Sequence, residues 1–254
     1  MTYLFSKTGF SALHNFIDPL TLLAFDFDGT LAPIAADPGG VRVSRRVREE
    51  LAGLMRLTKV AVLTGRARAD AQAHLGIDPH FLIGNHGAEG LPGQDTREAD
   101  FLKVSDGWER QLRGLLSPAD NDGVVVENKG ATISVHYRAS KNRAAARSRV
   151  LRSIELLVPR PRRISGKCVE NLVPLAAPNK GDALLYLMKH ARCPKGFYVG
   201  DDETDEDVFR LKGNQILTAR VGAARQSQAR YALRDQHEIT RLLREIVAIL
   251  ALSE

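Results

Sequence analysis

The stretch LLAFDFDGTLAPI, residues 22–34, decides the fold. Four apolar residues lead directly into two acids, Asp26 and Asp28, which one aromatic residue separates. A short apolar run of this kind predicts a buried strand of a parallel sheet. Two like charges at the end of such a strand are costly unless a cation or a proton-transfer partner lies beside them. The stretch therefore predicts a chemical site at the carboxyl end of this strand.

The composition is that of an ordinary globular protein. Of the 254 residues, 44% are hydrophobic and 26% are charged, which is typical of a soluble chain long enough for a substantial core. The two cysteines, Cys168 and Cys193, form neither a disulfide framework nor a metal-binding spacing. The N-terminal residues lack a signal-peptide pattern, and no apolar run approaches the roughly 20 residues of a membrane span. We therefore expect a reduced, cytoplasmic protein with no membrane partner, and the oligomeric state stays open.

The net charge of +6 is unevenly distributed along the chain. Residues 138–167 contain ten Lys and Arg residues and a single acid, Glu155. Such a segment is consistent with a solvated helix face, with attraction of an anionic small molecule, or with nucleic-acid contact. Because no aromatic residues are interleaved with the bases and no nucleic-acid-binding module is recognisable, we expect no nucleic-acid partner.

The first part of the chain alternates between strand and helix patterns. An amphipathic helix is predicted over 44–57, with Ser44 as its N-cap. Apolar runs at 59–65 and 81–85 predict two further buried strands, on either side of a helix at 67–75. This order of elements predicts a parallel sheet with right-handed crossovers.

A different pattern occupies the middle of the chain. It predicts a helix, an antiparallel hairpin, a second helix and one or two strands, at 97–117, 123–138, 140–157 and 162–174. The alternation then resumes, with a helix, a strand, a helix, a strand and a helix at 179–190, 196–200, 203–211, 214–220 and 235–252. We therefore predict an α/β fold. Its doubly wound, Rossmann-like parallel-sheet core is formed by residues 1–94 and 178–254, and an α+β unit is inserted at 95–177.

Polar side chains follow the predicted core strands, at the edge of the sheet where ligands bind in open parallel sheets. They are Asp26, Asp28, Thr64, Asn85, His86, Asp201 and Asp202, with Lys180 at the start of a helix. Carboxylates, a hydroxyl and an ammonium at one edge suit Mg²⁺-assisted phosphoryl transfer, because Mg²⁺ prefers hard oxygen ligands and screens a carboxylate from a phosphate. An EF-hand calcium loop has glycine at its sixth position, whereas DFDGT has Gly29 at the fourth and DDETDED has none, so we expect Mg²⁺ and not Ca²⁺.

Four motifs, in order, resemble those of the haloacid dehalogenase superfamily. AFDFDGTL resembles the nucleophile motif, VAVLTGR the second motif, Lys180 in NKG the third, and YVGDDETDED the fourth. Within the superfamily, FDFDGTLAPI, LTGR, GNHGAE, VENKG, HYR, NKGDAL and GDDETDEDVF together resemble trehalose-6-phosphate phosphatases, over about residues 22–210. The resemblance implies a catalytic core at 1–94 and 178–254 and a cap at 95–177 that selects the substrate.

The resemblance also implies roles in the reaction. Asp26 is expected to be the nucleophile that forms an aspartyl phosphate. Asp28 is expected to act first as general acid toward the leaving sugar oxygen and then as general base toward water. Gly29 permits a tight turn around the phosphate, and Thr64 is expected to hydrogen-bond a phosphate oxygen. Taken alone, Asp28 could be a turn former and Thr64 a helix cap.

The same resemblance implies a Mg²⁺ site. Its ligands are the side chains of Asp26 and Asp201 and the backbone carbonyl of Asp28. Lys180 is expected to hold the phosphate and the nucleophile by charge, although an isolated lysine at this position would more often lie at the surface. Asp202 and Asp205 are expected to orient the metal-bound waters and Lys180.

The remaining candidates are expected to bind the substrate. In the core segment they are Gly29, Arg66, Asn85, His86 and Glu89, and in the insertion Glu127, Lys129, His136, Arg138, Lys167 and Glu170. The four hairpin residues among them could instead form a solvent face, His86 could be structural, and Lys167 could pair with Glu170. The segment ENLVPLAAPNKG is longer than the family pattern and lacks its basic residue, so the register of Glu170 is open.

We therefore predict a Mg²⁺-dependent phosphatase that hydrolyses trehalose 6-phosphate to trehalose and phosphate through an aspartyl phosphate, in trehalose biosynthesis. The alternative is a phosphatase of the same superfamily that acts on sucrose 6-phosphate or on a glucosyl- or mannosyl-phosphoglycerate. A catalytically inactive binding protein is the alternative of a different class. The presence of Asp26, Asp28 and Asp201 argues against it.

Overall fold

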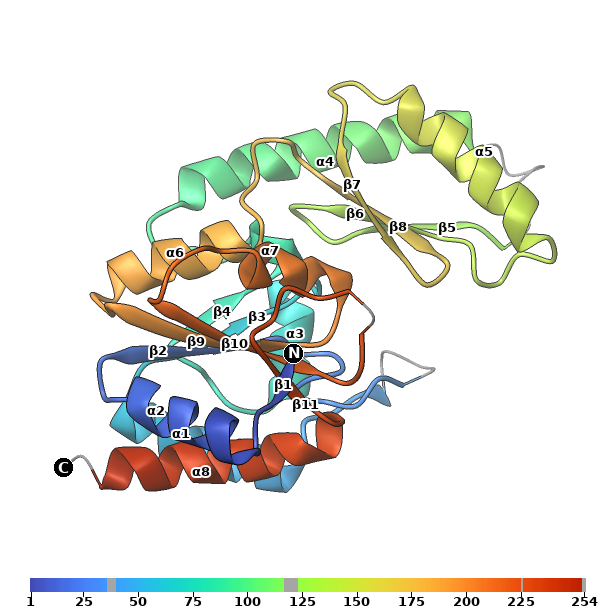
Figure 1. The fold of residues 1–254 in the computed structure, drawn as a ribbon. Helices are drawn as coiled ribbons and strands as arrows, with labels where there is room; N and C mark the ends of the chain where they lie inside the picture. The colour runs from blue at the N-terminus through green and yellow to red at the C-terminus, as the bar shows by residue number, and fades with distance from the viewer. Residues whose placement is uncertain (36–39, 117–122, 225, 253–254) are drawn as a thin grey trace. The chain divides into compact units, whose positions relative to one another are not determined.

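The computed structural model describes residues 1–35, 40–116, 123–224 and 226–252, and Figure 1 shows the course of the chain. The chain forms two compact units. The core unit comprises residues 1–87 and 178–254, and the inserted unit comprises residues 88–177. The predicted bounds of the insertion are 95–177.

A parallel sheet forms the centre of the core unit. Among the described residues it has seven strands in the order β1-β11-β10-β9-β2-β3-β4, and all pairs are parallel. The strands are β1 (Thr2–Tyr3), β2 (Thr21–Phe25), β3 (Val60–Leu63), β4 (Phe81–Ile83), β9 (Lys195–Gly200), β10 (Ile216–Val221) and β11 (Tyr231–Leu233). The parallel α/β core is therefore confirmed. Because β2 lies between β9 and β3, the residues that follow β2 and β9 lie side by side at one edge.

Helices cover both faces of this sheet. They are α1 (Lys7–Phe16), α2 (Arg45–Leu57), α3 (Arg68–Leu75), α6 (Lys180–His190), α7 (Glu206–Phe209) and α8 (Ile239–Ala251). Figure 1 shows α1, α2 and α8 on one face, and α6 and α7 on the other. The apolar faces of α2 and α8 pack on the sheet in one continuous buried cluster. Ser44 caps α2 as predicted, since its side chain accepts a hydrogen bond from the Val47 backbone N–H.

Three features of the core differ from the sequence prediction. The predicted helix at 203–211 is a 3₁₀ turn at Glu203–Asp205 followed by the short α7. The predicted helix at 235–252 begins with a 3₁₀ turn at Gln236–Glu238, which Asp235 caps. The elements β1, α1 and β11 were not predicted. The edge strand β1 and its neighbour β11 are too short to show a period-2 pattern.

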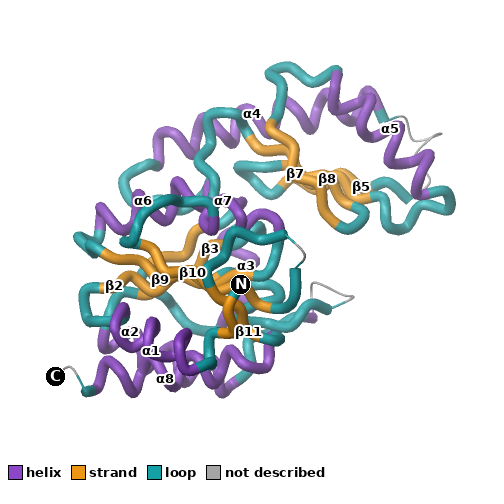
Figure 2. Tube along the Cα trace, in the orientation of Figure 1, coloured by secondary structure: helices purple, strands orange, loops and turns teal. Residues whose placement is uncertain are grey.

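The inserted unit is an α+β unit, as its pattern predicted. Its antiparallel sheet has the order β5-β6-β8-β7. The elements are α4 (Asp95–Leu115), β5 (Val125–Asn128), β6 (Ile133–His136), α5 (Arg143–Glu155), β7 (Arg162–Gly166) and β8 (Val169–Val173). Figure 2 shows α4 and α5 beside these strands. Trp108 of α4 and Val150 of α5 pack against Val135 and Leu172 in one buried cluster. One face of this sheet is therefore covered by helices.

Strand register separates the side chains of this sheet into two sets. Val135 pairs with Val126 and Glu170, and these residues share the helix-covered face. Ser134 pairs with Glu127 and Asn171, which must point to the opposite side because side chains alternate along a strand. We call this opposite side the helix-free face, because the α4–α5 cluster around Trp108 covers the other side; at one end of it Ile164 and Val173 still pack with Phe101 of α4.

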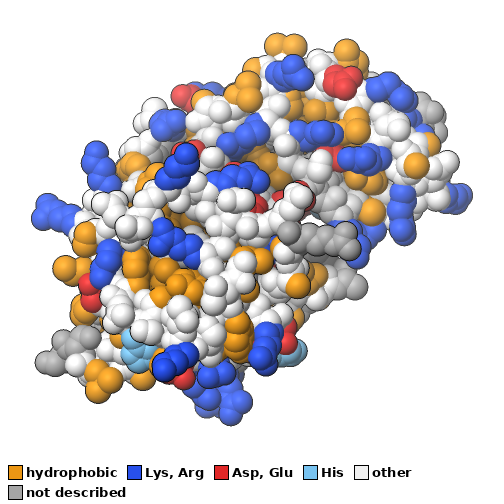
Figure 3. Space-filling model, viewed as in Figure 1, with side chains coloured by type: hydrophobic (Ala, Val, Ile, Leu, Met, Phe, Trp, Pro, Cys, Tyr) orange, Lys and Arg blue, Asp and Glu red, His pale blue; other side chains and the backbone are white. Residues whose placement is uncertain are grey.

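The basic residues of the inserted unit are largely exposed. Arg143, Arg147 and Arg152 of α5 all lie at the surface. Figure 3 shows Lys and Arg side chains spread over the visible face of the molecule. Within the described part of the chain, no helix is long and apolar enough to cross a membrane.

Candidate active site

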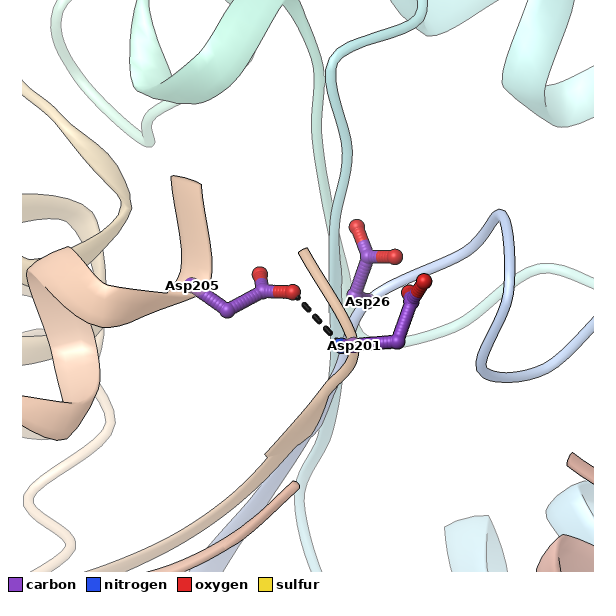
Figure 4. Close-up of side chains that lie close together, drawn as sticks. All are labelled: Asp26, Asp201 and Asp205. Atoms are coloured by element: carbon purple, nitrogen blue, oxygen red, sulfur yellow. Dashed lines mark hydrogen bonds between the residues drawn. The ribbon is translucent and has the colours of Figure 1, made fainter. Parts of the chain in front are cut away.

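Three acids meet at the carboxyl edge of the core sheet. Asp26 follows β2, Asp201 follows β9, and Asp205 ends the 3₁₀ turn beyond β9. One carboxylate oxygen of each lies within 4.8 Å of the others, and Figure 4 shows the three side chains. Asp26 and Asp205 are buried, whereas Asp201 is partly exposed. A hydrogen bond from the Asp26 backbone N–H to the Val199 carbonyl joins the ends of β2 and β9.

A buried ammonium bridges two of these acids. Lys180 Nζ donates hydrogen bonds to Asp26 Oδ1 at 2.6 Å and to Asp205 Oδ1 at 2.7 Å, and its side chain is only 2% exposed. Lys180 is the first residue of α6, and the Asn179–Asp182 capping box fixes that helix start. The sequence NKGD therefore both begins the helix and directs the ammonium at the acids.

Asp205 is held by donors on both carboxylate oxygens. Its Oδ1 accepts from the Tyr198 hydroxyl at 2.6 Å as well as from Lys180. Its Oδ2 accepts from the backbone N–H groups of Asp201 and Asp202, at 2.8 and 2.9 Å. A Cβ at Gly200 would lie 2.3 Å from this carboxyl group, so only glycine fits there. Asp205 therefore fixes Lys180 and the loop after β9, and Asp26 and Asp201 are the acids of this cluster with oxygens left that could bind a cation.

Burial and charge perturb the groups of this cluster. Burial raises the pKa of Asp26 well above its usual value, and the Lys180 charge offsets only part of this effect. Burial disfavours the Lys180 ammonium, but Asp205 and Asp26 together raise the pKa of Lys180 above its usual value. Burial, with the charges of Asp205 and Asp202, raises the pKa of Asp201 to about 7. Several carboxylates thus lie close together, and a divalent cation bound between them would reduce their mutual repulsion.

The loop after Asp28 packs directly against Asp201. Gly29 has a φ of +84°, and a Cβ on it would lie 2.2 Å from Asp201 Oδ2. Thr30 Oγ1 donates to Asp201 Oδ1 at 3.3 Å. Glycine is therefore required both by the backbone conformation and by the closeness of the carboxylate.

Arg66 lies on Asp28, where sequence analysis expected a substrate contact. Its guanidinium donates to Asp28 Oδ2 and Oδ1 at 2.7 and 2.8 Å, and to Asp70 Oδ2 at 2.8 Å. The same group lies over the Phe27 ring, 5.2 Å from its centroid, and Arg66 is 9% exposed. In this structure Arg66 therefore holds Asp28 with its guanidinium fork, and its expected substrate contact stays a prediction.

Thr64, Asn85 and His86 form the next part of the same edge. Thr64 Oγ1 accepts from the Arg66 backbone N–H at 3.1 Å, and Asn85 N–H donates to the Arg66 carbonyl at 2.7 Å. Asn85 and His86 have φ values of 51° and 59°, an unusual conformation for residues other than glycine. A Cβ at Gly65 would lie 2.4 Å from the His86 ring, so Gly65 makes room for this histidine.

The substrate-binding residues predicted in the inserted unit lie partly on its sheet and partly in its turns. Glu127 and His136 lie on the helix-free face, with Glu127 Oε2 2.7 Å from His136 Nε2. Lys129 lies in the β5–β6 turn, where its N–H donates to the Thr132 carbonyl. Arg138 and Lys167 are exposed and joined through a bond from the Arg138 side chain to the Lys167 carbonyl. Glu89, partly buried, also belongs to this unit.

Glu170 is not on the helix-free face, which corrects its expected sugar contact. Its side chain is fully buried on the helix-covered side. It accepts from Ser165 Oγ at 2.6 Å and from Arg147 Nε at 3.3 Å, and the Tyr137 hydroxyl lies 3.4 Å away. A shift of register by one residue moves every side chain to the other face. Here that parity places Asn171 on the helix-free face.

Asp202 also differs from expectation. Its exposed side chain accepts a hydrogen bond from the Glu203 N–H and caps the 3₁₀ turn. Asp205, and not Asp202, accepts a hydrogen bond from Lys180. Tyr198 and Arg220 also contact this cluster and were not predicted. Arg220 of β10 donates to the backbone carbonyls of Asp201 and Asp202. Neither carries a local motif, although both lie near the ends of predicted core strands.

The arrangement defines a class of protein. A parallel α/β core with an acidic cluster at its strand ends, interrupted by an α+β unit, is the haloacid-dehalogenase type of fold with a cap. A crystal structure of a trehalose-6-phosphate phosphatase related protein shares it, with a TM-score of 0.75 at 22% identity over 92% of this chain and 100% of that one. At this identity the likeness concerns the fold.

A family model described as trehalose-phosphatase matches residues 24–237. The chain belongs to the trehalose-phosphatase family. It is 26% identical to trehalose-phosphate phosphatase B of Arabidopsis thaliana over 248 residues, covering 89% of this chain and 66% of that protein. It is 34% identical to trehalose-phosphate phosphatase of Mycobacterium tuberculosis over 200 residues, covering 74% of this chain and 50% of that protein. The chain thus spans between half and two thirds of these relatives.

Proposed function

We propose that this chain is a Mg²⁺-dependent phosphatase that hydrolyses trehalose 6-phosphate to trehalose and phosphate. The observation that carries the proposal is the buried Asp26 carboxylate, held by Lys180 beside Asp201 at the ends of two adjacent strands. Family membership and the activities named for the two relatives support the substrate. The free cysteines Cys168 and Cys193 support a reducing, cytoplasmic location.

The residues present fit a divalent cation. Asp26 and Asp201 have converging oxygens, and Asp205 is already saturated by four donors. We therefore assign the side-chain ligands to Asp26 and Asp201, with the backbone carbonyl of Asp28 as a third. When bound, Mg²⁺ supplies charge that neutralises the clustered acids and the phosphate. An all-oxygen donor set is the kind that Mg²⁺ prefers.

Asp26 is the proposed nucleophile. One carboxylate oxygen attacks phosphorus while the bond to the sugar oxygen breaks, which leaves an aspartyl phosphate. Lys180 orients Asp26 through its 2.6 Å hydrogen bond and adds positive charge toward the phosphate oxygens. Thr64, at the end of the adjacent strand, supplies a hydroxyl to the phosphate.

Asp28 is the proposed proton carrier. Protonated, it donates to the leaving sugar oxygen, and as the resulting carboxylate it accepts a proton from the water that hydrolyses the aspartyl phosphate. The Asp28 side chain is 39% exposed in its pair with Arg66. It is therefore open to solvent on the side away from the guanidinium.

The inserted unit is the proposed specificity cap. Residues 95–177 carry the polar groups of the hairpin, and a site that satisfies buried hydroxyls selects sharply among sugars. Lys129, Arg138 and Lys167 add positive charge that attracts a phosphorylated substrate.

A panel of sugar phosphates tests the proposal. We expect the purified chain with Mg²⁺ to give its highest kcat/KM on trehalose 6-phosphate, and EDTA to abolish phosphate release. Asp26→Asn should be inactive on every substrate, including p-nitrophenyl phosphate. A higher kcat/KM on sucrose 6-phosphate or on a glycosyl-phosphoglycerate would replace the proposed substrate. Activity retained by Asp26→Asn would remove the nucleophile assignment.

A further inference from the structure

A side chain from the C-terminal part of the core unit reaches the loop that follows the proposed nucleophile. Gln236 is the first residue of the 3₁₀ turn before α8, and it is partly buried. Its amide nitrogen Nε2 donates to the Thr30 carbonyl at 3.1 Å and to the Leu31 carbonyl at 3.3 Å. Both of these residues are fully buried. The contact joins positions that are 206 and 205 residues apart, so it exists only in the folded core.

The loop that Gln236 contacts forms a tight turn next to Asp28. The Gly29 N–H donates to the Ala32 carbonyl at 2.8 Å, and the Ala32 N–H donates to the Phe27 carbonyl at 2.9 Å. These bonds close the turn around Asp28, whose backbone carbonyl is the proposed third ligand of Mg²⁺. The two carbonyls that accept from Gln236 belong to the residues between Gly29 and Ala32. Gln236 therefore holds the tip of the turn from outside.

The same turn contacts a second proposed ligand of the ion. Thr30 Oγ1 donates to Asp201 Oδ1 at 3.3 Å, so a single residue links Gln236 to the Asp201 carboxylate. A shift of the turn would move the Asp28 carbonyl and the Thr30 hydroxyl together. Groups that bind a metal must be held within about 0.5 Å of their productive positions, and residues that orient such groups affect metal affinity.

The segment that presents Gln236 is itself fixed at both ends. Asp235 caps the 3₁₀ turn, because its side chain accepts from the His237 N–H at 2.9 Å. At the other end the Glu238 carboxylate accepts from the hydroxyl of Tyr3 in β1. A side chain on a fixed backbone loses less conformational freedom when it binds, so its hydrogen bonds hold their partner more effectively.

We propose that Gln236 is a positioning residue for the Mg²⁺-binding loop, which acts by holding the tip of the turn at residues 29–32. The inference rests on the proposed function for the metal and the reaction. An amide nitrogen has two N–H donors, and here both are directed at backbone carbonyls. Without them, two buried carbonyls would lose a donor, which is unfavourable unless the turn moves toward other donors or water. Because the amide is uncharged, Gln236 acts on the geometry of the loop.

The test compares two variants of Gln236 with a matched control in the inserted unit. Gln236→Ala removes the donors, and Gln236→Glu keeps the length of the side chain but presents oxygens to the two carbonyls. Gln111→Ala is the control, because Gln111 Nε2 likewise donates to two backbone carbonyls, those of Val158 at 2.7 Å and Gly107 at 3.3 Å. Each protein is studied by calorimetric Mg²⁺ titration, steady-state kinetics and thermal unfolding.

We expect both Gln236 variants to bind Mg²⁺ at least about tenfold more weakly than the wild type. At saturating Mg²⁺ their kcat should fall about tenfold with KM little changed. The fall should be the same on trehalose 6-phosphate and on p-nitrophenyl phosphate, because the turn serves the reacting groups and not the sugar. Gln111→Ala should lower Tm and leave Mg²⁺ affinity and kcat unchanged.

Several results would overturn the inference. They are unchanged Mg²⁺ affinity in Gln236→Ala, an equal weakening in Gln111→Ala, a loss of kcat confined to trehalose 6-phosphate, and failure of both Gln236 variants to fold. No Mg²⁺ binding by the wild type would overturn it as well. If the wild type bound Mg²⁺ but hydrolysed no phosphate ester, the proposed function would fail, and the Mg²⁺ titrations would still decide the role of Gln236.

Discussion

Arg66 binds both carboxylate oxygens of Asp28, through its Nε and Nη2 atoms. Its third guanidinium nitrogen, Nη1, donates to Asp70, four residues further along the chain. All three guanidinium nitrogens thus bind carboxylates, and Arg66 itself is buried. Planar, two-pronged pairing fixes the direction of a carboxylate, which a lysine at the same position cannot do. We conclude that Arg66 positions the proposed proton carrier.

Replacement of Arg66 by Lys should therefore lower kcat while changing KM little. We expect a loss of about 10- to 100-fold in kcat, because proton transfer by a positioned group contributes roughly 10²–10⁴-fold. In the Asp28→Asn background the same replacement should have no further effect, since Arg66 acts through Asp28. Steady-state kinetics of the four proteins measure this coupling. Arg45→Lys, which alters an exposed ion pair with Glu49, is the control. Additive losses in the double variant would show that Arg66 acts elsewhere.

The fold and the core acids could be predicted because their determinants are local. Each acid follows a short apolar run, and parallel strands bring the carboxyl ends of those runs together at one edge. The partner that a side chain binds is not determined by local sequence. Arg66 was expected to contact the substrate, and its ion pair with Asp28 was not predicted, because that pairing depends on how two loops pack.

The face of Glu170 could not be predicted for a second reason. Side chains alternate along a strand, so one residue of register decides between the helices and the helix-free face. The sequence VENLV has apolar and polar residues at both parities, and only the pairing of Val135 with Glu170 settles the choice. Arg220 and Tyr198 could not be predicted for a third reason. They lie within strands, and the apolar pattern of those strands indicates only that they are buried, not which side chains reach the site.

Lys180 is expected to stabilise the fold as well as the site. Lys180→Met would leave Asp26 and Asp205 buried without their shared cation, and breaking a buried pair costs about 3–5 kcal/mol. Denaturant unfolding with EDTA present should show this loss. Adding Asp205→Asn to Lys180→Met should recover part of it, because one uncompensated charge is removed. No recovery in the double variant would mean that the loss is one of packing.

Asp201 should make the metal-free protein less stable as pH rises. The pKa of Asp201 is raised to about 7, so its proton is held more tightly in the folded than in the unfolded chain. The resulting stability is full below the ordinary carboxyl pKa and is lost as pH rises through 7. With EDTA, Asp201→Asn should therefore gain about 1–3 kcal/mol over the wild type at pH 8 and little at pH 4.

Added Mg²⁺ should reverse this order at pH 8, because Asp201 is then a ligand and a bound ion stabilises the folded state. Unfolding free energies of both proteins at the two pH values, with and without Mg²⁺, test the prediction. If Asp201→Asn were equally stabilised by Mg²⁺, Asp201 would not be a ligand of the ion.

Gly29→Ala should disrupt the site more than the fold. The new Cβ would lie 2.2 Å from Asp201 Oδ2, and a φ of +84° strains any residue with a Cβ. Gly93 is a matched control, because it has a φ of +69° and a Cβ added there would meet no heavy atom within 4 Å. Its replacement therefore adds the strain without the collision. Each change should cost about 1 kcal/mol through the backbone.

Only Gly29→Ala should displace the Asp201 carboxylate and weaken Mg²⁺ binding. We expect it to lower kcat/KM by at least about tenfold, since site geometry must be held within about 0.5 Å. Calorimetric Mg²⁺ titration and kinetics of Gly29→Ala and Gly93→Ala decide the matter. Equal effects in the two would attribute the loss to strain alone and remove the requirement for close approach at Gly29.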